Sequence, residues 1–295
     1  MHETVEPRRV EAVGDVVAEL GEGPCWDAPA SALLWVDIPG GRLHRTVHPA
    51  GETSTAHLGA PVSAALPAAD GRVLVSRRDR LVVIEADGTE RTVAATSLPP
   101  AMRFNDAATD PQGRVWIGSM DTSESSAVGA LYRLDPGGVL TPVLTGVTVS
   151  NGLGWSPDGS RMYYVDSPTR RVDVLDFEAT AGEVSGRRRF AGLAGAPGLP
   201  DGLTVDAGGG VWVALYGGGA LRRYGPDGRL EVVVPLPVSH PTSCAFAGPG
   251  LADLYVTTAS APLSGAERAA QPLAGRLLRL RPGLSGIPLP AAVIG

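Results

Sequence analysis

The chain has 295 residues, of which 43% are hydrophobic, and it is rich in turn-forming residues, with 39 glycines and 26 prolines. This length is enough to bury a sizeable core, and the net charge of -6 argues against nucleic acid or an anionic membrane as a partner. All 25 positions occupied by lysine or arginine are arginines. The absence of lysine excludes Schiff-base, pyridoxal-phosphate and Walker-type phosphate chemistry.

The first seven residues are acidic and polar, without the basic and apolar regions of a signal peptide. No apolar run approaches the ~20 residues that a membrane span needs. We therefore expect a cytoplasmic protein that does not enter a membrane. The two cysteines, Cys25 and Cys244, are expected to behave as small buried hydrophobic residues, with a disulfide between them left open.

Short apolar segments recur along the chain, and each follows a turn rich in Gly, Pro or Asp. Their central residues are 39, 42, 48, 48 and 43 positions apart. A repeat of this length, with several strands in each unit, is typical of the blades of a β-propeller. In chain order, the six predicted strands are 33–36, 73–75, 115–117, 162–165, 211–214 and 254–256.

Further apolar segments, closed by Asp, Pro and Gly turns, predict antiparallel hairpins at 81–84, 129–134, 220–224 and 275–280. Residues 10–20 precede the first repeat, and we expect them to pair with the last blade and close the ring. The pattern leaves room for one short helix, at 266–270. The predicted fold is therefore all-β, a six-bladed propeller of four-stranded antiparallel blades, in one domain over residues 1–295.

A five-residue segment recurs before each of the six strands. Its first residue is called the lead position here. In a propeller the innermost strands line the central channel, so equivalent positions in different blades surround the axis. Four of the six lead residues carry a carboxylate or an amide, whose oxygens are of the kind that Ca²⁺ and Mg²⁺ bind, which predicts a cation site in the channel. The lead residues are Glu22, Val62, Asn105, Asn151, Asp201 and Thr242.

Simpler interpretations of these residues stay open. Asn-Gly and Asp-Gly are common turn dipeptides, so Asn151 and Asp201 could only shape the backbone. Arg103 lies two residues before Asn105 and therefore on the same face of a strand, where it could bind a substrate or form a salt bridge with Asp106. His240 is expected to be structural. The arginine runs 77–78 and 187–189 are expected to be solvated loop charges.

Several motifs resemble those of the senescence-marker-protein/gluconolactonase family, also called regucalcin-like, and the resemblance covers residues 20–280. It implies a six-bladed propeller that binds one divalent metal ion in its channel and hydrolyses sugar lactones. The motifs are Leu-Gly-Glu-Gly-Pro at 20–24, Arg-Phe-Asn-Asp at 103–106, Ser-Asn-Gly-Leu at 150–153, Pro-Asp-Gly at 200–202 and Pro-Thr-Ser-Cys-Ala-Phe at 241–246.

Carried over by position, the resemblance implies that Glu22, Asn151 and Asp201 are the metal ligands. Arg103 and Asn105 would contact the substrate, and Asp201 would also be the catalytic acid/base. The chain departs from the family in the segment Asp-Thr-Ser-Glu at 121–124, where some members place a substrate-binding glutamate. The preferred sugar therefore stays open.

The leading hypothesis is a lactonase in which the metal polarises the lactone carbonyl and Asp201 takes a proton from water. In a variant of it, a metal-bound hydroxide attacks and Asp201 only orients it. Ca²⁺ is the expected ion, with Zn²⁺, Mn²⁺, Mg²⁺ and Fe²⁺ as alternatives. The expected partner is a small sugar lactone, and the protein is expected to be a monomer or weak dimer. The alternatives are an organophosphate or aryl-lactone hydrolase, and a non-catalytic calcium-binding propeller.

Overall fold

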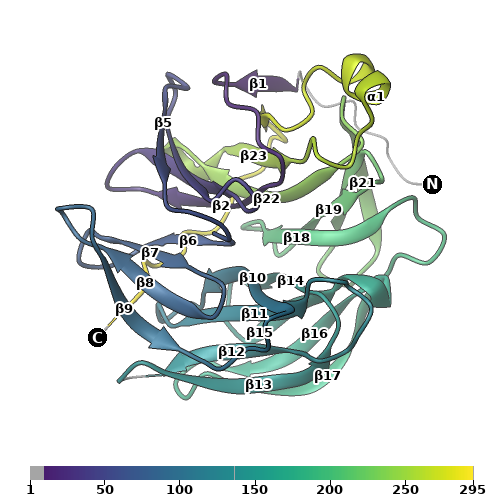
Figure 1. The fold of residues 1–295 in the computed structure, drawn as a ribbon. Coiled ribbons are helices and arrows are strands. Elements are labelled where there is room, and N and C mark those ends of the chain that lie inside the picture. The colour runs from purple at the N-terminus through teal and green to yellow at the C-terminus, as the bar shows by residue number, and fades with distance from the viewer. Residues whose placement is uncertain (1–9, 136, 295) are drawn as a thin grey trace.

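The computed structural model describes residues 10–135 and 137–294, and its strands form six four-stranded antiparallel sheets arranged in a ring (Figure 1). The first strand of each sheet contacts the first strands of its neighbours, so these inner strands surround the axis. The predicted six-bladed propeller is confirmed.

The first five blades each use four consecutive strands. Blade 1 contains β2 (Gly21–Asp27), β3 (Ala32–Asp37), β4 (Arg42–Val47) and β5 (Thr53–His57). Blade 2 contains β6 (Ala65–Pro67), β7 (Val73–Ser76), β8 (Arg80–Ile84) and β9 (Glu90–Ala95). Blade 3 contains β10 (Met102–Thr109), β11 (Val115–Asp121), β12 (Gly129–Asp135) and β13 (Val139–Val147).

Blades 4 to 6 complete the ring. Blade 4 contains β14 (Ser150–Trp155), β15 (Arg161–Asp166), β16 (Arg171–Glu178) and β17 (Glu183–Gly192). Blade 5 contains β18 (Leu199–Val205), β19 (Val211–Tyr216), β20 (Ala220–Tyr224) and β21 (Leu230–Pro235). Blade 6 contains β22 (Pro241–Ala247), β23 (Asp253–Thr258), β24 (Leu277–Leu280) and, from the start of the chain, β1 (Glu11–Val13).

The ring closes where β1 pairs with β24, so the expected closing strand is confirmed. Glu11 lies opposite Arg279 in this pair, and their side chains also form a salt bridge. An antiparallel bridge between Leu20 and Ala259 also joins the start of blade 1 to blade 6. Closure leaves no unpaired edge between the first and last blades.

A buried aspartate organises the turn after the inner strand in two blades. Asp206 is fully buried, accepts the backbone N–H groups of Gly208 and Gly210, and binds Trp212 Nε1 at 2.8 Å and Arg223 Nε at 2.6 Å. Asp110 does the same in blade 3, with Trp116 Nε1 at 3.1 Å. Each carboxylate thereby fixes a turn to the buried second strand of its blade.

The chain ends in a segment that crosses one end of the ring, and residues 285–293 are called the strap here. Its backbone is hydrogen-bonded to blade 5 through Ala207, to blade 6 through Leu251 and to blade 2 through Pro67. Thr109 Oγ1 of blade 3 donates to Pro290 O at 2.8 Å. In Figure 1 the strap is the yellow trace that runs across the ring towards the C-terminus.

The described part of the chain contains one α-helix, α1 (Gly265–Ala270), where a short helix was expected, and none of its helices is long and apolar enough to cross a membrane. Cys25 and Cys244 are both free, so no disulfide joins them. Residues 1–7, on which the expectation of a cytoplasmic location partly rests, lie outside the described residues.

Candidate active site

The lead positions lie at irregularities of the inner strands. The pairing register of the inner strand shifts in five blades, at Glu22/Cys25, Phe104/Ala107, Ser150/Leu153, Pro200/Leu203 and Pro241/Ser243. A bulge of this kind re-aims a side chain that regular pairing would direct elsewhere. Asn151-Gly152 and Asp201-Gly202 both lie inside strands, so the interpretation of these dipeptides as simple turns is wrong.

The glycine after Asn151 serves a close approach between blades. A Cβ atom on Gly152 would lie 2.6 Å from both the carbonyl oxygen of Asp201 and the backbone nitrogen of Leu203. Any side chain at this position would push β14 and β18 apart. The Asn-Gly pair therefore brings Asn151 next to Asp201 across the gap between blades 4 and 5.

Two of the three predicted metal ligands carry a buried oxygen that has no hydrogen-bond donor among the described residues. These atoms are Asn151 Oδ1 and Asp201 Oδ1. The Asn151 amide nitrogen donates to Ser167 Oγ at 3.1 Å, which leaves the amide oxygen free to face a cation. Glu22 is also buried, and its Oε2 atom accepts a hydrogen bond from the adjacent Gly23 N–H. Buried polar atoms are normally satisfied, so the unsatisfied pair fits a site built for a positively charged ligand.

Asn105, the other asparagine among the lead residues, is hydrogen-bonded through both atoms of its amide. Asn105 Oδ1 accepts a hydrogen bond from Arg103 Nη1 at 2.7 Å, and its Nδ2 donates to Ser150 O at 2.8 Å. Among residues 10–135 and 137–294, Arg103 forms no ion pair with Asp106 or any other acid within 4.0 Å, so the structure does not contain the alternative salt bridge. Arg103 and Asn105 instead form one hydrogen-bonded unit beside the channel acids.

Burial and mutual repulsion disfavour charge on the channel acids. Burial, and then the charge of Asp106, raise the pKa of Glu22 to about 8. Burial, and then the charges of Glu22 and Asp106, raise the pKa of Asp201 well above its usual value. Burial also raises the pKa of Asp106 to about 6. A divalent cation between these groups would favour their ionised forms.

The predicted ligand set contains two carboxylates and one amide. In the described ranges, no group of three or more His, Cys, Asp or Glu side chains is placed to hold a metal ion. The predicted set differs from such a group because one of its three ligands is an amide. All three offer oxygen atoms, which suit Ca²⁺ or Mg²⁺ better than a structural zinc ion. The three predicted ligands therefore fit the expected divalent metal ion.

Tyr216, His240 and Glu124 also belong to this end of the channel, and none of them was predicted as a site residue. Tyr216 ends β19 and packs edge-on against His240, with ring centroids 4.8 Å apart. Burial, and then the charges of Asp201, Glu124 and Glu22, raise the pKa of Tyr216 to about 12. Glu124 lies in a tight bend with φ of 57°, and its charge also acts on Arg103.

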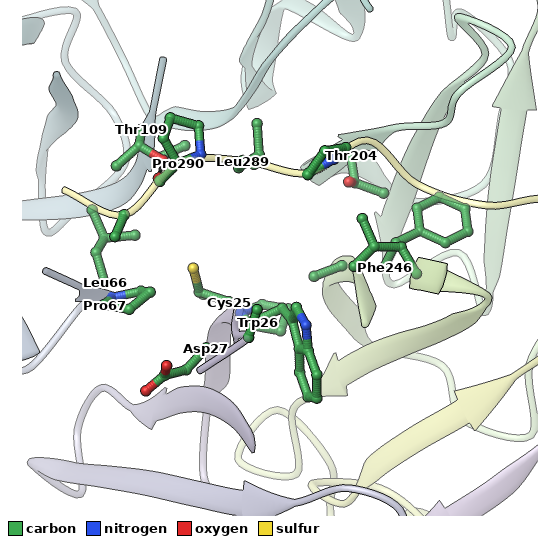
Figure 2. A pocket seen from close by; sticks show the side chains of 18 of the residues that line it. Cys25, Trp26, Asp27, Leu66, Pro67, Thr109, Thr204, Phe246, Leu289 and Pro290 are labelled. Atoms are coloured by element: carbon green, nitrogen blue, oxygen red, sulfur yellow. Dashed lines mark hydrogen bonds between the residues drawn. The ribbon is translucent and has the colours of Figure 1, made fainter. Parts of the chain in front are cut away.

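The other half of the channel holds a cavity of about 830 Å³, called the lower cavity here. Its walls begin just beyond the lead positions and include residues from all six inner strands, while the strap covers its far end (Figure 2). Glu22, Asn105, Asn151 and Asp201 do not line it. The candidate active site and the lower cavity therefore occupy opposite halves of one channel.

Comparison with known proteins shows which family this chain belongs to. Residues 20–260 match the SMP-30/gluconolactonase/LRE-like region. The chain belongs to this family. It is 38% identical over 288 residues to pentonolactonase XacC of Haloferax volcanii, covering 95% of this chain and 96% of that protein. It is 34% identical over 289 residues to regucalcin of Gallus gallus, covering 95% of this chain and 97% of that protein.

A solved structure agrees with this membership. The fold superposes on a regucalcin from Agrobacterium tumefaciens, described as a calcium-binding protein, with a TM-score of 0.92. The two are 28% identical, and the match covers 99% of each chain. The family resemblance expected from the sequence motifs is thus confirmed.

Proposed function

We propose that this protein is a metal-dependent hydrolase of sugar lactones, with Glu22, Asn151 and Asp201 as ligands of one divalent ion. The observation that carries the proposal is the pair of buried, unsatisfied oxygens on Asn151 and Asp201 within the channel. The 38% identity to a pentonolactonase over nearly the whole chain supports the enzyme class, a carboxylic ester hydrolase acting on a cyclic ester.

When bound, the ion would supply Lewis-acid polarisation of the lactone carbonyl and would lower the pKa of water. Asp201 would accept the proton from the attacking water and return a proton to the ring oxygen as the acyl carbon–oxygen bond breaks. Arg103, hydrogen-bonded to Asn105, would hold the sugar hydroxyls and so position the ring for attack. The product is the open-chain hydroxy acid.

Ca²⁺ is the ion we propose, because the three ligands present only oxygen atoms and Ca²⁺ tolerates irregular coordination. Zn²⁺, Mn²⁺, Mg²⁺ and Fe²⁺ remain the alternatives to test. The substrate is a small sugar lactone. A cytoplasmic location and a monomeric or weakly dimeric state stay predictions.

The test is an assay of chelator-treated protein with a panel of aldonolactones, restoring each divalent ion in turn. We expect activity to return with one or more ions and to favour aldonolactones over aryl esters and phosphotriesters. Preference for the aryl esters or phosphotriesters would support the alternative hydrolase. Absence of lactone hydrolysis with every ion, in protein that still binds metal, would support the non-catalytic calcium-binding alternative.

The raised pKa values give a prediction that does not depend on activity. Because burial raises the pKa of Glu22 to about 8 and that of Asp106 to about 6, these two acids hold more protons in the folded metal-free protein than in the unfolded chain over this range. Their contribution to the free energy of unfolding should therefore fall as pH rises from about 4 to about 8. Added Ca²⁺ should raise the thermal midpoint more at about pH 8 than at about pH 5, because it stabilises the ionised carboxylates.

Thermal unfolding at several pH values, with and without CaCl₂, measures this effect. Glu22→Gln is the informative variant, because it removes one ligand charge while preserving shape. A calcium-induced shift of equal size in Glu22→Gln and the wild type would contradict the assignment of Glu22 to the metal.

A further prediction concerns the segment 121–124, where the chain departs from its family. Glu124 is the acid of this segment whose charge acts on both Arg103 and Asp201, so we expect it to contact the substrate. Glu124→Gln should raise the KM for the preferred lactone by about tenfold while changing kcat less, the pattern of a lost binding contact. Glu183→Gln, at an exposed position of the outer strand β17, is the matched control. Equal KM values in the two variants would exclude this role.

A further inference from the structure

The lower cavity is structurally separate from the candidate active site. It is lined by parts of the inner strands that follow the lead positions, for example Leu153 and Gly154 in β14 and Leu203 to Val205 in β18. Its outer end is bounded by the exposed residues 28–30 and Gly250, so it reaches solvent beside the strap. A molecule in this space would not need to pass the predicted metal ligands.

The walls of the lower cavity are mainly apolar. Trp26 and Cys25 are only half-buried although they lie on an inner strand, because their side chains border this space. Figure 2 shows the Cys25 sulfur directed into the cavity, with the strap residues Leu289 and Pro290 on the opposite side. Leu66, Leu153, Leu203 and Phe246 complete the apolar lining.

Charged groups are confined to the inner end and the rim. Asp106 lines the inner end, and one of its carboxylate oxygens already accepts the Ala107 N–H at 2.8 Å. At the rim, Asp27 and Arg45 neutralise each other in a salt bridge of 3.1 Å, and Arg72 is paired with Asp70 and Glu85. Burial raises the pKa of the Cys25 thiol to about 12, so it is uncharged at neutral pH. The cavity therefore offers no free cation to an anionic ligand.

The size and chemistry of this space are those of a ligand site rather than a packing defect. Natural small-molecule pockets have volumes of roughly 300–1,000 Å³ and combine apolar walls with a few polar groups. Apolar surface left facing water is unfavourable, and a bound apolar molecule would cover it. The strap closes the end of the channel with backbone hydrogen bonds to four blades, so it forms a fixed wall of the site.

We infer that the lower half of the channel is a second small-molecule site, which takes an uncharged, mainly apolar ligand carrying a hydrogen-bond donor that faces Asp106. This ligand differs in kind from a sugar lactone, whose hydroxyl groups would find few partners among the apolar walls. The site is independent of the lactonase proposal, because none of the residues assigned to metal binding or to substrate binding lines it.

The test uses N-phenyl-1-naphthylamine, a neutral apolar amine whose fluorescence rises in apolar surroundings. We expect saturable binding of one probe per full-length chain. Cys25→Phe, which fills the cavity, should weaken probe binding by about tenfold or more. Ala245→Phe fills the same cavity from blade 6, and it decides the question if Cys25→Phe fails to fold. Val128→Phe, at a 58% exposed position outside the cavity, should bind the probe like the wild type.

Two further measurements separate this site from the candidate active site. Aldonolactones should not displace the probe, and Asp201→Asn should bind it like the wild type. The inference is overturned if the folded wild type shows no saturable probe binding, if folded cavity-filling variants bind as the wild type does, or if lactones displace the probe. Because the probe measures binding and not hydrolysis, this test stays valid even if the protein proves not to be a lactonase.

Discussion

Replacing Asp201 with asparagine should reduce kcat/KM for the preferred lactone by about 10³-fold or more, because a general acid/base typically contributes about 10² to 10⁴ and a ligand is weakened as well. The substitution keeps an oxygen at a position where Asp201 Oδ1 is buried and has no donor. Metal binding should therefore weaken but survive at high ion concentration. Activity should stay low even when the metal site is saturated.

The comparison with Asp201→Ala separates the two roles of this carboxylate. The alanine variant loses both the ligand atom and the base, so it should bind metal more weakly than the asparagine variant while being similarly inactive. Asp253→Asn is the matched control, since Asp253 is also a buried aspartate but pairs with Arg281 outside the channel. Near-normal turnover by folded, metal-saturated Asp201→Asn would refute the acid/base role and favour the variant in which Asp201 only orients the nucleophile.

Replacing Asp206 with alanine should lower the free energy of unfolding by about 3–5 kcal/mol, the usual effect of removing one partner of a buried ion pair. The change leaves Trp212 Nε1 without its acceptor and removes the buried one of two carboxylates from Arg223, whose side chain is only 11% exposed and keeps the more exposed Glu231. Chemical denaturation monitored by tryptophan fluorescence measures the effect. Asp227→Ala, in an exposed turn of the same blade, should change the free energy of unfolding by less than about 1 kcal/mol.

The effect of Asp206→Ala should also depend on pH. Burial opposes ionisation of Asp206, but the hydrogen bonds from Arg223, Gly210 and Trp212 outweigh it and hold the pKa below its usual value. A lowered pKa contributes stability above the unfolded-state pKa of about 3.9, and that contribution is lost as pH falls through the folded-state value. The difference between variant and wild type should therefore shrink in strong acid. A loss of stability no larger than that of Asp227→Ala at neutral pH would show that the turn does not depend on this carboxylate.

Features that repeat along the chain were predictable from sequence, because each blade presents the same pattern again. The spacing of the apolar strands from Trp35 to Tyr255 predicted the six blades, and the shared offset of Glu22, Asn151 and Asp201 predicted their common position in the channel. The structure adds the β-bulges at these positions and the close approach at Gly152. Neither leaves a sequence signal beyond a glycine that is equally common in turns.

The strap and the contacts of the arginine runs were not predictable, although the pairing of the first strand with the last blade was. The strap contains no periodic pattern, and its hydrogen bonds to Leu251 and Pro67 depend on the completed ring. The expectation that arginines 77–78 are solvated loop charges is wrong, because Arg77 donates to Leu58 O at 2.7 Å and Arg78 donates to Pro99 O at 3.1 Å. A run of arginines looks the same in sequence whether its partners are water molecules or carbonyl groups of a neighbouring loop.

The pairing of β1 with β24 determines the order in which the molecule can be assembled. Each of the first five blades consists of contiguous chain, so each can form as soon as its own residues are available. The last blade joins Glu11 to Arg279, which are 268 positions apart, so this contact closes a loop that includes nearly all of the described chain. Long loops carry the greatest entropic cost of closure and slow the formation of the contacts that depend on them.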